Sequence, residues 1–89
     1  MRVVWTDYLK YKASLRGFNL SSIEHIIVHS SERYNDVVTG RRIAVGRYDG
    51  KLVLIPYELD EDVIIPVTIH ITTRQQINIR IKTGRFIYG

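Results

Sequence analysis

The 89-residue sequence contains no cysteine, so it can form neither a disulfide framework nor a thiolate zinc site. It has only two prolines and no low-complexity or linker-like stretch, and we therefore expect one domain over residues 1–89. No apolar run approaches the roughly 20 residues of a membrane-spanning helix, and the apolar run at the N-terminus is too short for a signal peptide. These absences predict a cytoplasmic protein that does not enter the membrane.

The remaining composition is that of a globular chain. Hydrophobic residues make up 45% and aromatic residues 10% of the sequence, which is enough for a core and argues against disorder. A chain of this size buries only about two thirds of its unfolded surface, so we expect marginal stability for the isolated domain. A partner that covers apolar surface, another protein or a second copy in a homodimer, would therefore help it.

Positive charge is concentrated at one end of the chain. Up to Thr73, nine basic residues balance nine acidic ones, and residues 74–89 contain no acid. The whole net charge of +4 therefore comes from four residues, Arg74, Arg80, Lys82 and Arg85. Such a block favours an anionic partner, namely RNA, phosphate or an acidic protein, although a solvated surface helix has the same composition.

Two helices are expected first. Thr6 and Asp7 are residues that begin helices, and the segment after them is rich in helix formers up to Arg16, with a stop at Gly17. A second helix, capped by Ser21 or Ser22, is expected to end near residue 30, because its isoleucines recur at helical spacing.

Four strands are expected next, over residues 33–38, 41–48, 51–58 and 63–72, and a short strand over residues 2–5 is an alternative for the N-terminus. The turn pair Asp49-Gly50 between two strand-like runs is a strong hairpin signal. The spacing predicts an antiparallel meander whose last strand is central, because that strand is apolar on both faces. Pro56 has no amide hydrogen to donate and predicts a bulge or an edge.

Residues 74–83 fit two structures. Isoleucines alternate with polar residues, as in a strand, but Thr73 and Gln76 match a capping box and Gly84 supplies a helix stop. We favour a short basic helix. The expected fold class is thus α+β, with two N-terminal helices, a four-stranded antiparallel meander sheet and a C-terminal helix.

After the two expected helices come residues 42–58 (RIAVGRYDGKLVLIPYE), an acidic turn, residues 67–74 (VTIHITTR) and a basic end. This order of segments resembles that of the BrnT toxins and of related small domains in the RelE and colicin-type nuclease superfamily. The opening Trp5-Thr6-Asp7 with Lys12 is also similar to the start of BrnT-like chains. The resemblance implies a metal-independent ribonuclease toxin without a cofactor, neutralised by a cognate DNA-binding antitoxin.

The resemblance also implies which residues form the site: His70, Arg74, Arg80, Arg85 and Tyr88. Arginine matches phosphate oxygens with its planar fork, and histidine transfers protons near neutral pH. A tyrosine can stack on a base or donate a proton. Nucleic acid binding is expected from Arg74, Arg80, Lys82 and Arg85. The isoleucines after Arg74 and the position of Pro56 depart from the family pattern and leave a non-catalytic branch open.

Each of these residues also has a purely structural interpretation. His70 can cap or support a strand, and Arg74 can pair with Glu58 or another acid. The alternative function is a non-enzymatic module that binds RNA or an acidic protein through the basic C-terminal segment. His25 and His29 have metal-ligand spacing but no evident third ligand, so no metal site is expected.

Overall fold

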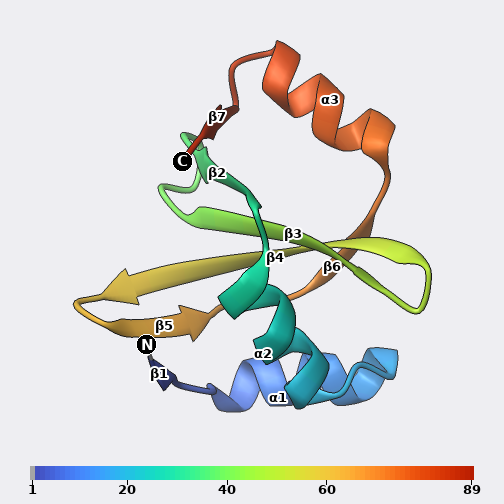
Figure 1. Cartoon of the computed structure of the whole chain (residues 1–89), viewed down its shortest axis with the longest axis vertical. Coiled ribbons are helices and arrows are strands. Elements are labelled where there is room, and N and C mark those ends of the chain that lie inside the picture. Colours follow the sequence, from blue (N-terminus) through green and yellow to red (C-terminus); the bar gives the residue numbers. More distant parts are fainter. Residues whose placement is uncertain (1) are drawn as a thin grey trace.

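The computed structural model describes residues 2–89, which form an α+β domain of three helices and a seven-stranded mixed sheet (Figure 1). In chain order the elements are β1 (Arg2–Val3), α1 (Asp7–Arg16), α2 (Leu20–His29), β2 (Glu32–Asp36), β3 (Arg42–Tyr48), β4 (Lys51–Asp60), β5 (Val63–Pro66), β6 (His70–Thr72), α3 (Arg74–Lys82) and β7 (Phe86–Tyr88). Helices α1 and α2 lie at one end of the molecule and α3 lies at the other. None of the helices within residues 2–89 is long and apolar enough to cross a membrane.

Helix α1 has the ends that the sequence predicts. The Thr6 hydroxyl accepts a hydrogen bond from the Leu9 amide at 3.1 Å, which satisfies one of the free donors of the first turn. Gly17 ends the helix in the left-handed conformation, with a φ of 76° that a residue with a Cβ adopts only under strain.

Helix α2 begins earlier than expected. Its cap is Asn19, not Ser21 or Ser22, because the Asn19 side-chain oxygen accepts a hydrogen bond from the Ser22 amide at 2.8 Å. The Ser21 hydroxyl donates to the same oxygen at 3.0 Å, so this serine supports the cap instead of forming it. Asparagine and serine are about equally favourable N-caps, so residue type alone does not separate Asn19 from Ser21 and Ser22. The extended backbone of Asn19 identifies it as the cap.

Residues 74–82 are helical, so the strand alternative for this segment is wrong. The Thr73 hydroxyl accepts a hydrogen bond from the Gln76 amide at 3.1 Å. The Gln76 side chain does not complete the capping box, because its oxygen accepts a hydrogen bond from the Thr72 hydroxyl at 3.0 Å.

The sheet is larger than the expected four-stranded meander. Its order is β1-β5-β4-β3-β2-β7, with β6 paired to β4 beyond the end of β5. The antiparallel steps from β2 through β5 agree with the prediction. The prediction missed β7, which pairs antiparallel with β2, and it missed that β1 pairs parallel with β5. Both added strands are too short to show alternation, and both pair with residues far away in the sequence.

Residues 63–72 form two strands, not one. β5 pairs with β4 as far as Tyr57↔Pro66, and pairing resumes in β6 at Leu54↔His70. Pro56 lies between these two registers, and its carbonyl accepts a hydrogen bond from the Val67 amide at 2.8 Å. Its ring nitrogen faces the same gap, where no donor is required. Pro56 is thus at neither a bulge nor an edge of β4, because its pairing with Ile43 of β3 is continuous with its neighbours; the irregularity is the break between β5 and β6 that it faces. The central strand is β4, not the segment over 63–72.

Alternating side chains of β4 supply two hydrophobic clusters on opposite faces of the sheet. Val53, Ile55 and Tyr57 belong to the cluster formed with α1 and α2. Leu52 and Leu54 belong to the cluster formed with α3, β2 and β7. Each helical layer is thus attached to the same strand from the opposite side.

Gly46 in β3 packs directly against Ile26 of α2. A Cβ at this position would lie 2.5 Å from Cγ2 and 3.3 Å from Cβ of Ile26. Ile26 is buried and branched at Cβ, so neither atom can swing away. The absence of a side chain at Gly46 therefore sets how deeply α2 packs.

We predict that Gly46→Ala lowers the free energy of unfolding by about 2 kcal/mol, as expected for overpacking in a dense core. Urea denaturation measures this change. In an Ile26→Ala background the same alanine has room, and its added cost should shrink markedly. An equal cost in both backgrounds would contradict the steric explanation.

Candidate functional site

A groove of about 430 Å³ opens on the α3 side of the sheet. Its apolar floor comes from Ile43, Leu54, Pro56 and Phe86. Its polar walls come from five side chains, Asp36, Arg41, His70, Arg80 and Arg85, together with nearby threonines and Gln76. A floor formed by strands and walls rich in arginine suit an extended anionic ligand.

His70 is placed in the groove by strand register. It is the first residue of β6 and lies opposite Leu54, so the two side chains lie on the same face of the sheet. The ring is exposed, yet partial burial lowers its pKa below the usual 6.5, and the positive charges of Arg16, Lys12 and Arg80 lower it further. The imidazole is therefore neutral at pH 7 and able to accept a proton.

Arg80 reaches the groove from the last turn of α3. Its guanidinium lies 5.5 Å from the centre of the Phe86 ring, which holds it by a cation–π contact. Within residues 2–89 Arg80 takes part in no ion pair. Its hydrogen-bond donors are thus available to a ligand.

Arg85 is held by Asp36. Its Nε and one Nη each donate to a carboxylate oxygen at 3.1 Å, and Asp36 is only 4% exposed. Burial by itself would raise the pKa of Asp36, but the hydrogen bonds from Arg85 and from the Val38 and Thr39 amides outweigh it and lower that pKa. Arg85 is therefore fixed in orientation, with its second terminal nitrogen not used by this pair.

Two buried side-chain atoms of groove residues lack a hydrogen-bond partner within residues 2–89, the Arg41 Nε and the Thr68 Oγ1. Arg41 Nε lies 3.4 Å from a Glu58 carboxylate oxygen, but the geometry there is that of an ion pair without a hydrogen bond. Unsatisfied buried polar groups are uncommon and costly in folded proteins. Because both atoms belong to residues that line the same groove, a polar ligand bound there would have hydrogen-bonding groups to pair with.

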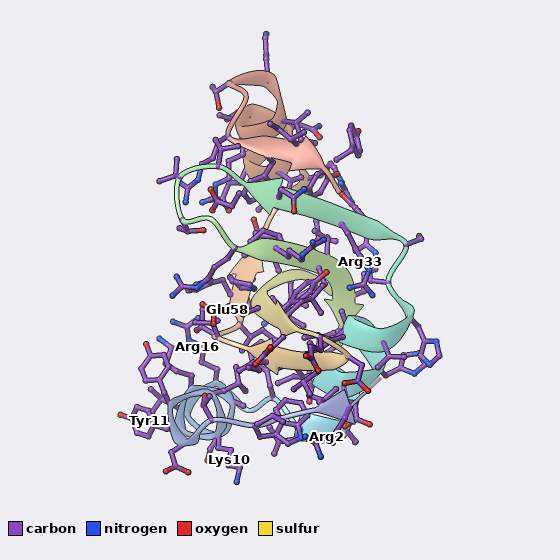
Figure 2. The ribbon with its side chains drawn as sticks, turned by 90° about the vertical axis from the view of Figure 1, so that its left-hand side faces the viewer. Arg2, Lys10, Tyr11, Arg16, Arg33 and Glu58 are labelled. Atoms are coloured by element: carbon purple, nitrogen blue, oxygen red, sulfur yellow. The ribbon has the colours of Figure 1, made fainter. Side chains whose placement is uncertain are left out.

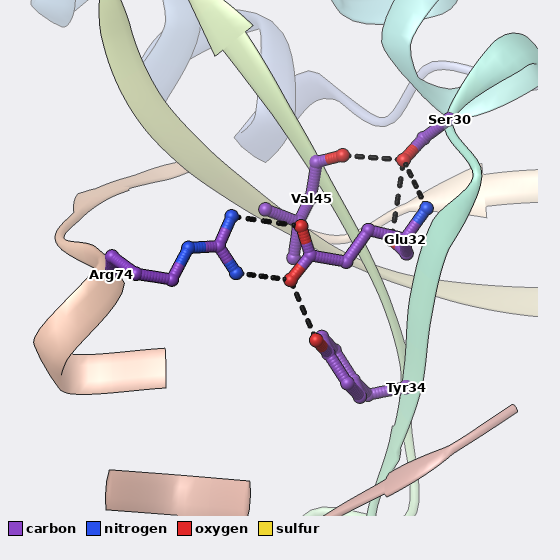
Figure 3. A network of polar contacts seen from close by, with 5 residues as sticks. All are labelled: Ser30, Glu32, Tyr34, Val45 and Arg74. Carbon is purple, nitrogen blue, oxygen red and sulfur yellow. Dashed lines mark hydrogen bonds and ion pairs between the residues drawn. The ribbon is translucent and has the colours of Figure 1, made fainter. Parts of the chain in front are cut away.

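Arg74, the nearest arginine to His70 in the sequence, does not join the groove. It donates to both oxygens of Glu32 at 2.6 and 3.0 Å (Figure 3). The Tyr34 hydroxyl donates to the same carboxylate at 2.6 Å. The hydrogen bond from Arg74 holds the pKa of Glu32 below its usual 4.5. Arg74 thus pairs with an acid, as one interpretation expected, although the acid is Glu32 and not Glu58.

Tyr88 and Lys82 also lie outside the groove lining. Tyr88 belongs to the edge strand β7, where it is 74% exposed and its ring packs 5.2 Å from that of Tyr34. Lys82 is exposed at the end of α3. Of the five site residues implied by the resemblance, the structure brings together His70, Arg80 and Arg85.

Sequence reasoning missed the cations that α1 contributes. Arg16 donates to the Ile69 carbonyl at 3.1 Å, directly before His70, and Figure 2 shows it reaching toward the sheet while Tyr11 points away from it. Lys12 lies one helical turn earlier on the same side of α1. The sequence could have shown that Lys12 and Arg16 lie on one side of α1, because they are four residues apart in a segment predicted to be helical.

Comparison with known proteins found no matching family model, curated protein or solved structure. No group of three or more candidate metal ligands occurs among residues 2–89. Function must therefore be inferred from the arrangement of the groove itself.

We predict that Asp36→Asn lowers the free energy of unfolding by about 2 kcal/mol at pH 7, less than for a fully buried pair because Arg85 is partly exposed. The native pair contributes fully above the usual pKa of 3.8 and is lost as pH falls through the lower folded value. Chemical denaturation from pH 7 downward should therefore show a shallower acid loss in the variant. Asp60→Asn, at the exposed end of β4, is the control, and an equal effect from it would contradict the prediction.

We predict that NMR titration of His70 gives a midpoint below 6.5, and that Arg16→Gln moves it upward, because one of the repelling charges is removed. As pH falls below 6.5 the unfolded chain takes up the proton first, so the fold loses stability in that window. Lys10→Gln serves as the charge control on α1 and should leave the midpoint unchanged. A midpoint at or above 6.5 in the native chain would refute the assignment.

Proposed function

We propose that this chain is a metal-independent endoribonuclease, acting in the cytoplasm as the toxin of a toxin–antitoxin pair. The observation that carries the proposal is that one groove is lined by a histidine of lowered pKa and three arginines, His70 with Arg41, Arg80 and Arg85. Phosphodiester cleavage without a metal requires a group that takes a proton and cations that stabilise charge on the phosphoryl oxygens.

Two arginines supply the phosphate site in this mechanism. Arg80 has free donors and is oriented by Phe86, while Arg85 is oriented by Asp36. A fixed guanidinium loses little freedom when it binds, and its planar fork matches two phosphate oxygens. The apolar floor beneath them limits water and strengthens the attraction.

His70 acts as the base. Its neutral ring takes the proton of the ribose 2′-hydroxyl as that oxygen attacks phosphorus and the bond to the 5′-oxygen breaks. The 5′-oxygen takes a proton from water, the remaining hydroxide takes the proton from His70 and restores its neutral ring, and the products are a 2′,3′-cyclic phosphate and a 5′-hydroxyl. Tyr88 takes no part in this scheme, because its exposed ring lies on β7 outside the groove lining.

A second candidate is a non-enzymatic module that binds RNA or an acidic protein. It is supported by the arginines that line the groove, Arg41, Arg80 and Arg85, because the ion pairs of Arg74 and Arg85 leave fewer free cations in the C-terminal segment than its composition indicates. A binding module needs only the charge of the groove, whereas a nuclease also needs the proton transfer at His70.

We predict that the purified chain cleaves RNA in the presence of a chelator and leaves cyclic phosphate ends. His70→Gln should slow cleavage by at least about 100-fold, because general-base catalysis typically contributes that much, while RNA binding is retained. The cleavage rate of the native chain should rise with pH below 6.5 and level off by neutral pH.

The matched control is His25→Gln, which replaces an exposed histidine of α2 outside the groove and should cleave as the native chain does. Induction in a bacterial host should likewise arrest growth for the native chain and not for His70→Gln at equal abundance. Binding without cleavage would support the second candidate, and cleavage that persists in His70→Gln would refute the assigned base.

A further inference from the structure

Helix α1, on the face of the sheet opposite α3, leaves an apolar face uncovered. Its buried residues are Leu9 and Ala13, whereas Tyr8, Tyr11 and Leu15 are 58%, 62% and 66% exposed. Tyr8 and Tyr11 are three residues apart, and Tyr11 and Leu15 are four apart, so the three exposed side chains are neighbours on one side of the helix.

One column of this helix leads from the exposed aromatic face to the groove. Tyr8, Lys12 and Arg16 follow one another at a spacing of four, so they are neighbours along one side of α1. Lys12 Nζ lies 5.9 Å from the centre of the Tyr8 ring, and Arg16 donates to the carbonyl before His70. The column extends about 12 Å from Tyr8 to Arg16 at the rise of an α-helix.

The charge of the column is positive throughout. Asp7 is the only acid in α1, and it precedes the column at the start of the helix. The column approaches the groove at β6, because Arg16 donates to the carbonyl of Ile69 and the next residue, His70, lines the groove. The positive charges of Arg16 and Lys12 also help to lower the pKa of His70. A polyanion that leaves the groove past His70 meets Arg16, then Lys12 and then the ring of Tyr8.

We propose that this column is a binding site for single-stranded RNA, in which Lys12 and Arg16 contact phosphates and Tyr8 stacks on an unpaired base. Stacking on an aromatic ring beside a cationic track is the usual way in which proteins hold single strands without reading sequence. A duplex keeps its bases paired and offers none to Tyr8. The inference rests on the proposed function, because the strand that crosses α1 is the one bound in the groove.

The test is the affinity of the full chain for a short fluorescent 2′-O-methyl oligouridylate, which cannot be cleaved, and for an abasic oligomer of equal length and charge. Tyr8→Ser should weaken binding of the oligouridylate roughly tenfold and leave binding of the abasic oligomer unchanged. Tyr8→Phe keeps the ring and should restore the native affinity.

Charge variants on the same helix give a second comparison. Lys12→Gln should weaken binding of both oligomers and reduce its salt dependence, because a phosphate contact is lost. Lys10→Gln removes the same charge from an exposed position outside the column and should bind as the native chain does.

Equal oligouridylate affinity of Tyr8→Ser and the native chain would overturn the inference, as would an equal loss on both oligomers. A change from dimer to monomer in Tyr8→Ser, without an effect on RNA, would also overturn it and assign this face to a second copy. If the chain binds the oligouridylate in a way that depends on Tyr8 but cleaves no RNA, the proposed nuclease activity is refuted and the proposed binding site stands. Absence of binding to either oligomer by the native chain would overturn both.

Discussion

The alternation of side chains along β4 is the constraint on which the rest of the molecule depends. This strand pairs with β3 on one side and with β5 and β6 on the other, and its two faces supply two separate cores. A shift of one residue in its register would exchange those faces and expose both cores. The groove depends on the same alternation, because Leu54 and Pro56 form its floor and Leu54 fixes the position of His70.

Local signals were sufficient for α1, α3 and the central hairpins, and for the presence of α2 but not for its cap. The Thr6 and Thr73 caps, the Gly17 stop and the Asp49-Gly50 turn act over a few residues, so their sequence patterns predict the structure directly. The sheet edges depend on pairing between distant segments. Residues 86–88 become a strand only because β2 offers them an edge, and no pattern within three residues can indicate this.

The sequence predicted the secondary structure better than it predicted which positive charges remain unpaired. Counting along the chain placed all surplus positive charge after Thr73, but Arg74 and Arg85 are each paired with a carboxylate far away in the sequence. The groove takes positive charge from Arg41 as well as from Arg80 and Arg85, and the charges of Lys12 and Arg16 on α1 help to lower the pKa of His70. A sum over a segment cannot show which charges are neutralised, because that depends on long-range contacts. The spacing of Lys12 and Arg16 could have been interpreted, since both lie in a predicted helix.

The groove joins segments that lie far apart in the sequence. Asp36 is in β2, and its ion-pair partner Arg85 directly precedes β7, which pairs with β2 at the edge of the sheet. The cluster under α1 and α2 uses no residue after Ile69. Local opening of β7, a strand of three residues, would therefore release Arg85 from the groove and leave that cluster intact.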